Sequence, residues 1–412
     1  MKRKKTLVAL LLCLVLIICT LALVACGNNE DDNAIIASEL SDFTLSADNK
    51  TVLGLEKSDA TKIVIPDGIE QIAPNAFKEL TQIVGVTIPN SVTNIGDYAF
   101  YGCSRLKSIN IPDNVTNIGN FMCYGCGNLT QVTIGSGVSE INRYAFYSCD
   151  SLKSITIPHG VTSIGESAFS GDRNLAGVTL PDSVTNIGSY AFSHCSELTS
   201  ITIPNGVTNI GSSAFIGCSK ITTITIPSNV INIGIQAFSK CDSLTSISVA
   251  QGNPVYHSAG NCIIDTANKT LITGCGPSII PSDGSVTSIN DFAFYVCDGL
   301  TSITIPENVK SIGERAFTEC SALTSITIEG ATYIGNVAFA YCNALTTVTI
   351  PESMTIIDDW AFKECSRLTS IIYRGSKAQW EALSKGRNWN EDSGYFTIHC
   401  TDGDLDKNSN EI

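Results

Sequence analysis

The stretch Ser151-Leu-Lys-Ser-Ile-Thr-Ile-Pro-His-Gly-Val-Thr-Ser-Ile-Gly-Glu-Ser-Ala-Phe169 decides how this chain folds, because close copies of it return along most of the sequence. The copies align on their last aromatic residue, and the aligned positions are Phe77, Phe100, Cys123, Phe146, Phe169, Phe192, Phe215, Phe238, Phe294, Phe317, Phe339 and Phe362. The interval is 23 residues, except for one of 56 after Phe238 and one of 22 after Phe317. Twelve copies at a fixed period predict an array of stacked repeats rather than two or three globular domains.

Each position of the repeat has a physical interpretation. The segment Leu198-Thr-Ser-Ile-Thr-Ile203 alternates isoleucine with hydroxyl residues, which is the pattern of a half-buried strand. A proline usually follows and ends the strand, because it lacks an N–H donor. In Val184-Thr-Asn-Ile-Gly188 the last position holds Gly, or Asn and Asp in other copies, so we expect a left-handed corner there. The closing Ala-Phe is expected to pack inward on a short helical turn.

The repeat length predicts the fold class. A period of 23 falls within the 20–29 residues of leucine-rich repeats. One coil cannot bury its apolar residues alone, whereas a stack of coils can. We therefore predict a β-rich solenoid, a curved leucine-rich-repeat array of short parallel strands with 23-residue coils, closed by hairpin and helix/strand caps.

A cysteine stands three residues after the anchor in ten of the twelve copies. These residues are Cys103, Cys126, Cys149, Cys195, Cys218, Cys241, Cys297, Cys320, Cys342 and Cys365, with Leu80 and Asp172 in the other two copies. Equivalent side chains of stacked strands lie about 4.8 Å apart and point the same way, which disfavours disulfides between them. We expect a ladder of buried free thiols that cap backbone groups.

The unit Cys-Ser-x-Leu-Thr-Ser-Ile-Thr-Ile-Pro-x-x-Val-Thr-x-Ile-Gly-x-x-Ala-Phe resembles the repeat of the BspA-like leucine-rich-repeat proteins over roughly residues 61–373. The resemblance implies a curved solenoid and a bacterial surface protein concerned with adhesion and with binding host proteins. One copy departs from the pattern, because Phe121-Met122-Cys123 stands where Ala-Phe is expected. We expect a looser layer there.

The N-terminus has the composition of an export signal. Basic residues at 2–5 precede an apolar run that ends in Leu23-Val24-Ala25-Cys26, which is similar to the lipobox of bacterial lipoproteins. We predict that residues 1–25 are a lipoprotein signal peptide and that Cys26 is the lipid attachment site, followed by an acidic tether over residues 26–40. An uncleaved transmembrane helix and simple secretion are the alternatives. Each places the body of the chain outside the cytoplasm, and the first predicts a membrane anchor at the bacterial cell surface.

Two related phrases divide the repeats into blocks. Residues 43–53 and 261–272 each place two apolar runs around a polar turn, as in a hairpin. The predicted organisation is a capping hairpin at 41–60, a first repeat block at 61–249, a hairpin insertion at 250–278, a second block at 279–373, and a C-terminal cap and tail at 374–412. In that tail, Ser376 to Gln379 forms a capping box at the start of a helix. A separate ligand module is the alternative interpretation of the tail.

The sequence offers little chemistry. The net charge of −14, which becomes four charges more negative without residues 1–25, argues against nucleic-acid binding. The only histidines are His159, His194, His257 and His399, and none has metal-ligand spacing to another. Cys123-x-x-Cys126 lacks a second pair for a zinc site. We predict no catalytic residue, no cofactor and no metal, and we name Cys262 and Cys275, which flank the insertion hairpin, as a possible disulfide.

A row of threonines remains as the candidate ligand face. Thr133, Thr156, Thr179, Thr202, Thr225, Thr304, Thr327 and Thr349 occupy one equivalent outward position. We predict a lipid-anchored, non-enzymatic surface protein whose strand face mediates adhesion or recognition of an extracellular or host matrix protein or glycan. The alternative is a structural spacer or envelope component without a specific ligand, because threonine is in any case a good strand former.

Overall fold

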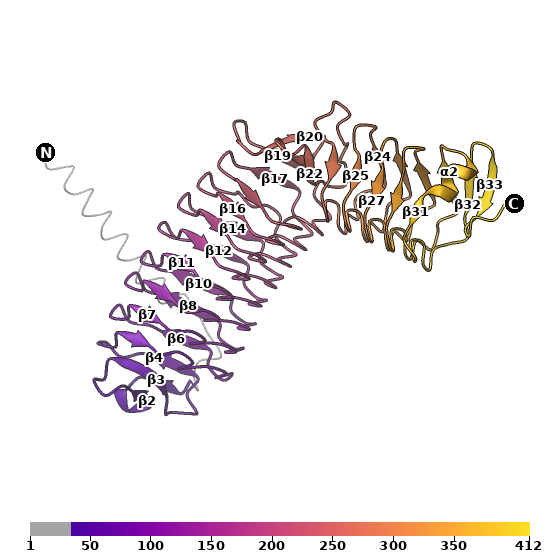
Figure 1. The fold of residues 1–412 in the computed structure, drawn as a ribbon. Coiled ribbons are helices and arrows are strands. Elements are labelled where there is room, and N and C mark those ends of the chain that lie inside the picture. The colour runs from indigo at the N-terminus through magenta and orange to yellow at the C-terminus, as the bar shows by residue number, and fades with distance from the viewer. Residues whose placement is uncertain (1–33) are drawn as a thin grey trace, which may run out of the picture.

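The computed structural model describes residues 34–412, and over this part of the chain it is one elongated, bent solenoid of about 16 turns (Figure 1). The predicted fold class is confirmed. The signal peptide, Cys26 and most of the tether lie outside the described residues. Within residues 34–412, no helix has the length and apolar character that crossing a bilayer requires.

Each coil contributes a strand to a first row, formed by the Leu-x-x-Ile-x-Ile segments. Its strands are β1 (Ile36–Ala37), β4 (Lys62–Val64), β6 (Gly85–Thr87), β8 (Ser108–Ile111), β10 (Gln131–Ile134), β12 (Ser154–Thr156), β14 (Gly177–Thr179), β17 (Thr223–Ile226) and β19 (Ser246–Val249), followed by β24 (Ser302–Ile305), β26 (Ser325–Ile328), β28 (Thr347–Ile350), β30 (Ser370–Tyr373), β32 (Thr397–Cys400) and β33 (Gly403–Asp406). The row consists of four sheets, β1 to β10, β12 with β14, β17 with β19, and β24 to β33, and neighbouring strands within them pair in parallel, as in Ile155 with Val178, except for the antiparallel pair β32–β33. Residues 200–203 keep the buried–exposed alternation without being assigned as a strand.

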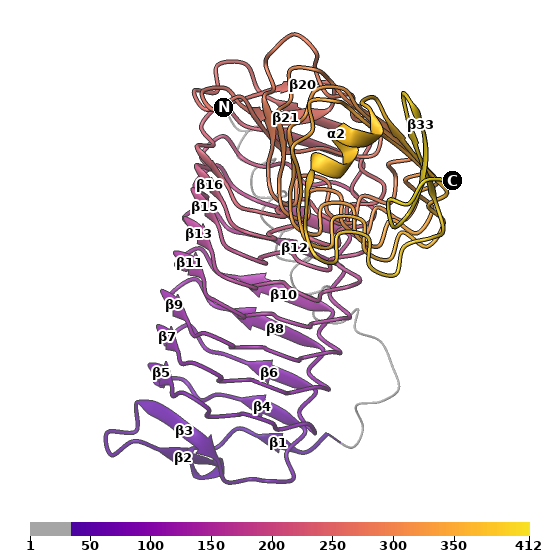
Figure 2. The ribbon, with the colours of Figure 1, turned by 45° about the vertical axis from the view of Figure 1, so that its right-hand side comes forward.

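A second row of two-residue strands, which the sequence interpretation missed, comes from the Val-x-x-Ile-Gly segments. Its strands are β5 (Gln71–Ile72), β7 (Asn94–Ile95), β9 (Asn117–Ile118), β11 (Glu140–Ile141), β13 (Ser163–Ile164), β15 (Asn186–Ile187), β16 (Asn209–Ile210), β18 (Asn232–Ile233), β23 (Ser288–Ile289), β25 (Ser311–Ile312), β27 (Tyr333–Ile334), β29 (Ile356–Ile357) and β31 (Ser384–Lys385). Asparagine side chains link successive coils, as in Asn209 Nδ2 to Asn186 Oδ1 at 2.7 Å. Figure 2 shows both rows along the first block.

The glycine of the Val-x-x-Ile-Gly segment is not a left-handed corner, and that expectation was wrong. Gly211 has no positive φ, but a Cβ on it would lie 2.4 Å from the backbone nitrogen of Ser189 in the preceding coil. Glycine is therefore favoured there by close approach of coils. The left-handed residues are two and six positions later, as in Ser213 (φ 55°) and Gly217 (φ 75°).

The Ala-Phe segment lies in a tight turn rather than a helical one, so that expectation was also wrong. Its backbone still links the coils, because the Phe169 amide donates to the Ala191 carbonyl at 2.8 Å. The anchor rings are buried and stack along the axis, as in Phe169 to Phe192 at 5.4 Å and Phe192 to Phe215 at 5.5 Å. Each anchor thus shares its apolar surface with two neighbouring coils.

Copy three interrupts this stack without leaving the core. Met122 and Cys123 are fully buried, and ring stacking runs from Phe77 to Phe100 and resumes only at Phe146. The aromatic ring of this copy, Phe121, lies at the surface instead. Phe121 holds the surface position of Tyr98 and Tyr144 in the neighbouring copies, so this layer has no anchor ring and fills the core with two sulfur-containing side chains.

Antiparallel hairpins stand at the start of both blocks. β2 (Phe43–Leu45) pairs with β3 (Thr51–Leu55), and β3 then runs parallel to β5. In the insertion, β20 (Tyr256–Ala259), β21 (Cys262–Asp265) and β22 (Thr270–Thr273) are antiparallel, and β22 runs parallel to β23. The short 3-10 helix η1 (Leu40–Asp42) precedes β2. The second hairpin therefore opens a new stack in the same way as the first.

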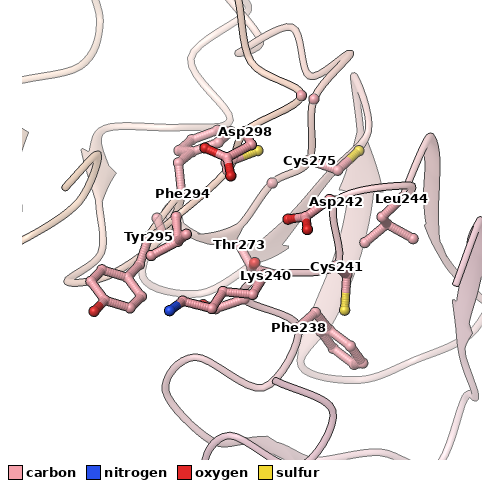
Figure 3. Close-up of a pocket in the computed structure, with 17 residues that line it drawn as sticks. Phe238, Lys240, Cys241, Asp242, Leu244, Thr273, Cys275, Phe294, Tyr295 and Asp298 are labelled. Carbon is pink, nitrogen blue, oxygen red and sulfur yellow. The ribbon is translucent and has the colours of Figure 1, made fainter. Parts of the chain in front are cut away.

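The solenoid bends at this insertion. On the anchor side the insertion contributes only Gly274-Cys275-Gly276, and a Cβ on Gly274 would overlap the Phe294 ring. A cavity of ≈ 20 Å³, large enough for about one water, separates the last turn of block one from the first turn of block two; its labelled lining includes Phe238, Asp242 and Asp298 (Figure 3). The hairpin strands add width on one side of the solenoid, and Gly274 and Gly276 allow a closer approach of coils on the anchor side. The solenoid axis therefore turns between β19 and β24 (Figure 1).

The C-terminal end closes the core with aromatic side chains. Helix α2 (Lys377–Ala382) begins with the expected capping box, in which Ser376 Oγ accepts from the Gln379 amide and Gln379 Oε1 accepts from the Ser376 amide. Trp380 is fully buried, and Trp389 meets the last anchor, Phe362, edge-on at 6.0 Å. These rings cover the apolar surface that a further coil would bury.

Candidate functional site

The predicted hydroxyl ribbon lies on the outer face of the first strand row. All eight threonines point away from the core, and Thr327 and Thr349 are half-buried while the other six are exposed. Their alignment follows from register, since Thr304 pairs with Thr327 and Thr327 with Thr349. Serines two residues earlier form a second column, and Thr225 and Ser248 of successive coils are joined by a 3.1 Å hydrogen bond.

An open groove of ≈ 550 Å³ lies on this ribbon where block two begins, and sequence reasoning did not find it. It is lined in part by Ile279, Thr304, Thr327 and Glu329. Ile279 is 74 % exposed, because its neighbour Ile280 takes the inward position. The groove therefore combines hydroxyls, one carboxylate and one exposed isoleucine, Ile279. Ligand pockets commonly have volumes of about 300–1,000 Å³ and such mixed linings.

Nine of the ten cysteines form the predicted ladder, whereas Cys297 is only partly buried and does not share its hydrogen bond. Cys195 Sγ donates to the Phe169 carbonyl at 3.2 Å, and Cys218 Sγ donates to the Phe192 carbonyl at 3.1 Å. The same bond to the residue at the preceding anchor position is made by Cys103, Cys126, Cys149, Cys241, Cys320, Cys342 and Cys365. Burial raises the pKa of the Cys218 thiol, and the adjacent Cys195 raises it further. A thiol in this state is a poor nucleophile.

The possible Cys262–Cys275 disulfide is not formed, because both residues are free thiols. Cys262 Sγ donates to the Gly260 carbonyl at 3.5 Å, and Ser278 Oγ lies 3.9 Å from Cys275 Sγ. Burial raises the pKa of Cys262 to about 12. Local backbone and hydroxyl groups therefore satisfy the two thiols separately.

Asp172 replaces a cysteine of the ladder. Its Oδ1 accepts from the Cys149 amide at 2.7 Å, while Oδ2 is buried without a hydrogen-bond partner. Burial raises the pKa of this carboxyl well above its ordinary value; the Cys149 amide opposes the shift and Asp150 adds to it. Ladder cysteines such as Cys195 donate to the carbonyl 26 residues earlier, so a cysteine at position 172 would donate to the Phe146 carbonyl.

Two columns of aromatic rings lie at the surface of copies two to four. Tyr98, Phe121 and Tyr144 form one column, and Tyr101, Tyr124 and Tyr147 form the other. The sequence holds the signal, since these residues stand two before and one after three consecutive anchor positions. Alignment on the buried anchors left them unnoticed.

Histidines are distributed over separate elements. His257 Nδ1 lies 2.9 Å from Thr266 Oγ1 in the insertion hairpin, and His399 Nδ1 lies 3.1 Å from Asp404 Oδ1 in the last hairpin. His159 and His194 occupy turns of different coils. The described residues hold no group of three His, Cys, Asp or Glu side chains arranged to bind a metal.

Stacked coils with a parallel strand row and an inward aliphatic-and-phenylalanine core define a leucine-rich-repeat solenoid. The chain belongs to the BspA-type leucine-rich-repeat family: the model described as BspA type leucine rich repeat region, six copies, matches residues 55–176, 162–270 and 274–382. None of the curated proteins matches the chain.

Two solved structures are similar to the chain over most of its length. A leucine rich cell surface protein from Faecalibacterium prausnitzii is 32% identical, with a TM-score of 0.59, covering 83% of this chain and 95% of its own. A leucine-rich repeat protein from Bacteroides ovatus is 25% identical, with a TM-score of 0.57, covering 90% and 93% respectively. TM-scores below 0.6 despite high coverage are consistent with arrays that differ in bend or coil number.

Proposed function

We propose that this chain is a lipid-anchored surface protein that binds an extended extracellular partner, a matrix protein or a glycan, through the hydroxyl ribbon. The observation that carries the proposal is the uncharged, exposed ribbon with the groove beside Ile279. The similarity to a protein described as a cell surface protein supports the location.

The chemistry of the ribbon favours weak, repeated contacts. Its threonine hydroxyls both donate and accept hydrogen bonds and recur about every 4.8 Å along each block. A single hydroxyl contact contributes only about 0.5–1.5 kcal/mol, so useful affinity requires many at once. An extended polymer meets many coils together, and Ile279 offers one apolar contact that fixes its position.

We propose a binding role rather than an enzymatic one, because the ribbon offers no activated nucleophile. A hydroxyl attacks only when a positioned base takes its proton. The groove holds one carboxylate, Glu329, and the four histidines lie in other elements.

An array experiment tests the binding proposal. Residues 34–412 are presented to matrix proteins and neutral glycans, alongside the variants Ile279→Asp and Ile231→Asp. Ile231 is a matched control, since it is 57 % exposed but flanks the second strand row. We expect saturable binding that is weakened about tenfold or more by Ile279→Asp and unchanged by Ile231→Asp, as for loss of one buried apolar contact.

Two results oppose the proposal. Equal weakening by both substitutions would place the contact elsewhere or reflect altered folding. Repeated absence of saturable binding would favour the spacer function, for which the uniformity of the ribbon is the supporting observation. Anchoring is tested separately: the wild-type chain should enter the detergent phase and incorporate labelled fatty acid, and Cys26→Ser should do neither.

A further inference from the structure

The aromatic columns on copies two to four form a surface separate from the ribbon. Tyr98, Phe121 and Tyr144 stack at 4.7 and 4.6 Å with interplanar angles of 5° and 4°. The second column stacks at 4.8 and 4.6 Å with angles of 10° and 6°. We call these six rings the aromatic patch. All six are half-buried, whereas the anchor rings beneath them are fully buried.

The two columns lie against each other at an angle. Tyr98 and Tyr101 are 5.7 Å apart and inclined by 53°, and Tyr144 and Tyr147 are 5.6 Å apart and inclined by 50°. The rings therefore line a shallow V that runs along the solenoid axis. Because ring faces within a column cover each other, the surfaces left for a partner are mainly ring edges and hydroxyls.

Two cations lie against the columns. Lys78 Nζ lies 5.7 Å from the Tyr98 centroid and 5.2 Å from the Tyr101 centroid, at the first ring of each column. Arg143 lies over Phe121 and Tyr144 and is paired with Glu166 at 3.5 Å. Sugar rings, which stack on open aromatic faces, are thus disfavoured at the Lys78 end of both columns. Ring edges carry the positive end of the quadrupole and suit carbonyl oxygens.

The hydroxyls of the second column are available as donors. Tyr144 Oη lies 3.3 Å from Glu166 Oε1, whereas among the described residues Tyr101, Tyr124 and Tyr147 donate to no protein acceptor. Burial raises the pKa of Tyr124, and the neighbouring tyrosines add to the shift, so the Tyr124 hydroxyl remains a protonated donor at neutral pH. A fitting partner presents a row of unpaired backbone carbonyls along the V.

Polyproline II has this property and a matching repeat. It has no internal hydrogen bonds, so its carbonyls are free, and it rises about 3.1 Å per residue with three residues per turn. One turn is about 9.3 Å, and the two ring steps of the second column, 4.8 and 4.6 Å, cover nearly the same length. Carbonyls three residues apart can therefore meet Tyr101 and Tyr147 together. Aromatic-lined surfaces are an established way to bind proline-rich segments.

We propose that the aromatic patch binds a proline-rich segment in the polyproline II conformation, with an acidic residue of that segment beside Lys78. Lys78 supplies the charge at one end, while Arg143 at the other end is paired with Glu166. The proposal does not rest on the hydroxyl ribbon, and the two surfaces can be tested independently.

The test uses the full-length chain in mild detergent and a fluorescein-labelled octaproline flanked by aspartates at both ends, so that either chain direction is allowed. Fluorescence polarisation should show saturable binding, and a Gly-Ser peptide with the same flanks should not bind. The triple variant Tyr101→Phe, Tyr124→Phe, Tyr147→Phe keeps the rings and removes the hydroxyls, and it should weaken binding about tenfold or more. Tyr190→Phe, an exposed tyrosine outside the patch, is the matched control.

Charge is tested with the same probe flanked by lysines. The wild-type chain should prefer the aspartate form several-fold, and Lys78→Ala should remove that preference while Lys153→Ala keeps it. Thermal unfolding of each variant establishes that it is folded. No saturable binding of octaproline, equal binding of the Gly-Ser peptide, or full binding by the triple variant would each overturn the proposal. Ile279→Asp should leave octaproline binding intact, which separates this test from that of the ribbon.

Discussion

Replacing Asp172 by cysteine should stabilise the protein. The substitution restores the thiol that ten other coils place at this position, and nine of those thiols donate to a carbonyl of the preceding coil. It removes the buried, unpartnered Oδ2, whose desolvation costs about 1–3 kcal/mol. It also removes the bond from the Cys149 amide to Oδ1, worth about 0.5–1.5 kcal/mol. That amide keeps a 3.3 Å bond to the Phe146 carbonyl. The expected net increase in the free energy of unfolding is about 1 kcal/mol below about pH 4, where the carboxyl is protonated in both the folded and the unfolded state.

The difference should widen as pH rises. The pKa of Asp172 in the folded protein lies above its unfolded value of about 3.9. Between these two values the folded state holds one proton more than the unfolded state, so the wild type loses about 1.4 kcal/mol of stability per pH unit from this group. The loss stops once pH passes the folded-state pKa. Asp172→Cys and Asp172→Asn both lack this loss, because neither side chain ionises there.

Urea denaturation at pH 5, 6, 7 and 8 under reducing conditions measures the effect, with hydrogen exchange of residues 146–192 as a local probe. Asp182→Asn is the control, since Asp182 is an exposed acid outside the thiol ladder. A wild-type-to-Asp172→Cys difference that is constant from pH 5 to 8 would refute the assignment of a raised pKa. A less stable Asp172→Cys at pH 8 would refute the equivalence of the two side chains.

The packing makes three further predictions. Phe192→Ala should lower the free energy of unfolding by about 3–5 kcal/mol, because the ring is fully buried between two others. Tyr190→Ala at the surface should cost far less. Equal losses in urea denaturation would contradict the stacked core. Gly211→Ala should cost about 1–3 kcal/mol, because its Cβ would meet the Ser189 backbone; an unchanged melting temperature would contradict the close approach of coils. In native protein at pH 8, iodoacetamide should modify the partly exposed Cys400 before the ladder cysteines. The ladder thiols are buried, and burial raises the pKa of Cys365, for example, to about 12. Equal labelling in mass spectrometry, or disulfides in the ladder, would count against buried thiols.

The repeat alone was enough to predict the stack, the inward anchors and the thiol ladder, because each is a consequence of identical side chains recurring at one interval. The capping box at Ser376 was also predictable, since it depends on two residues in one short segment. The glycine at position 211 was assigned a role by its conformational freedom, and its actual constraint, contact with Ser189 of another coil, is visible only once the coil spacing is known.

Features at boundaries between copies were not predictable in the same way. The exposed position of Ile279 depends on how the insertion enters the next coil, and the bend depends on Gly274 to Gly276 replacing an anchor layer. The aromatic patch was readable in principle. Tyr101 and its equivalents recur at the repeat interval, but whether such rings stack at the surface depends on turns whose left-handed residues the sequence does not mark.

Small-angle X-ray scattering of residues 34–412 tests the stacked, bent array most directly. About 16 turns at roughly 4.8 Å per turn give a long particle. The distribution of interatomic distances should therefore be skewed, with a tail to roughly 75–80 Å. A compact domain of this length would have a radius of gyration of about 21 Å and a symmetric distribution that ends near roughly 55 Å. That second result would contradict the account.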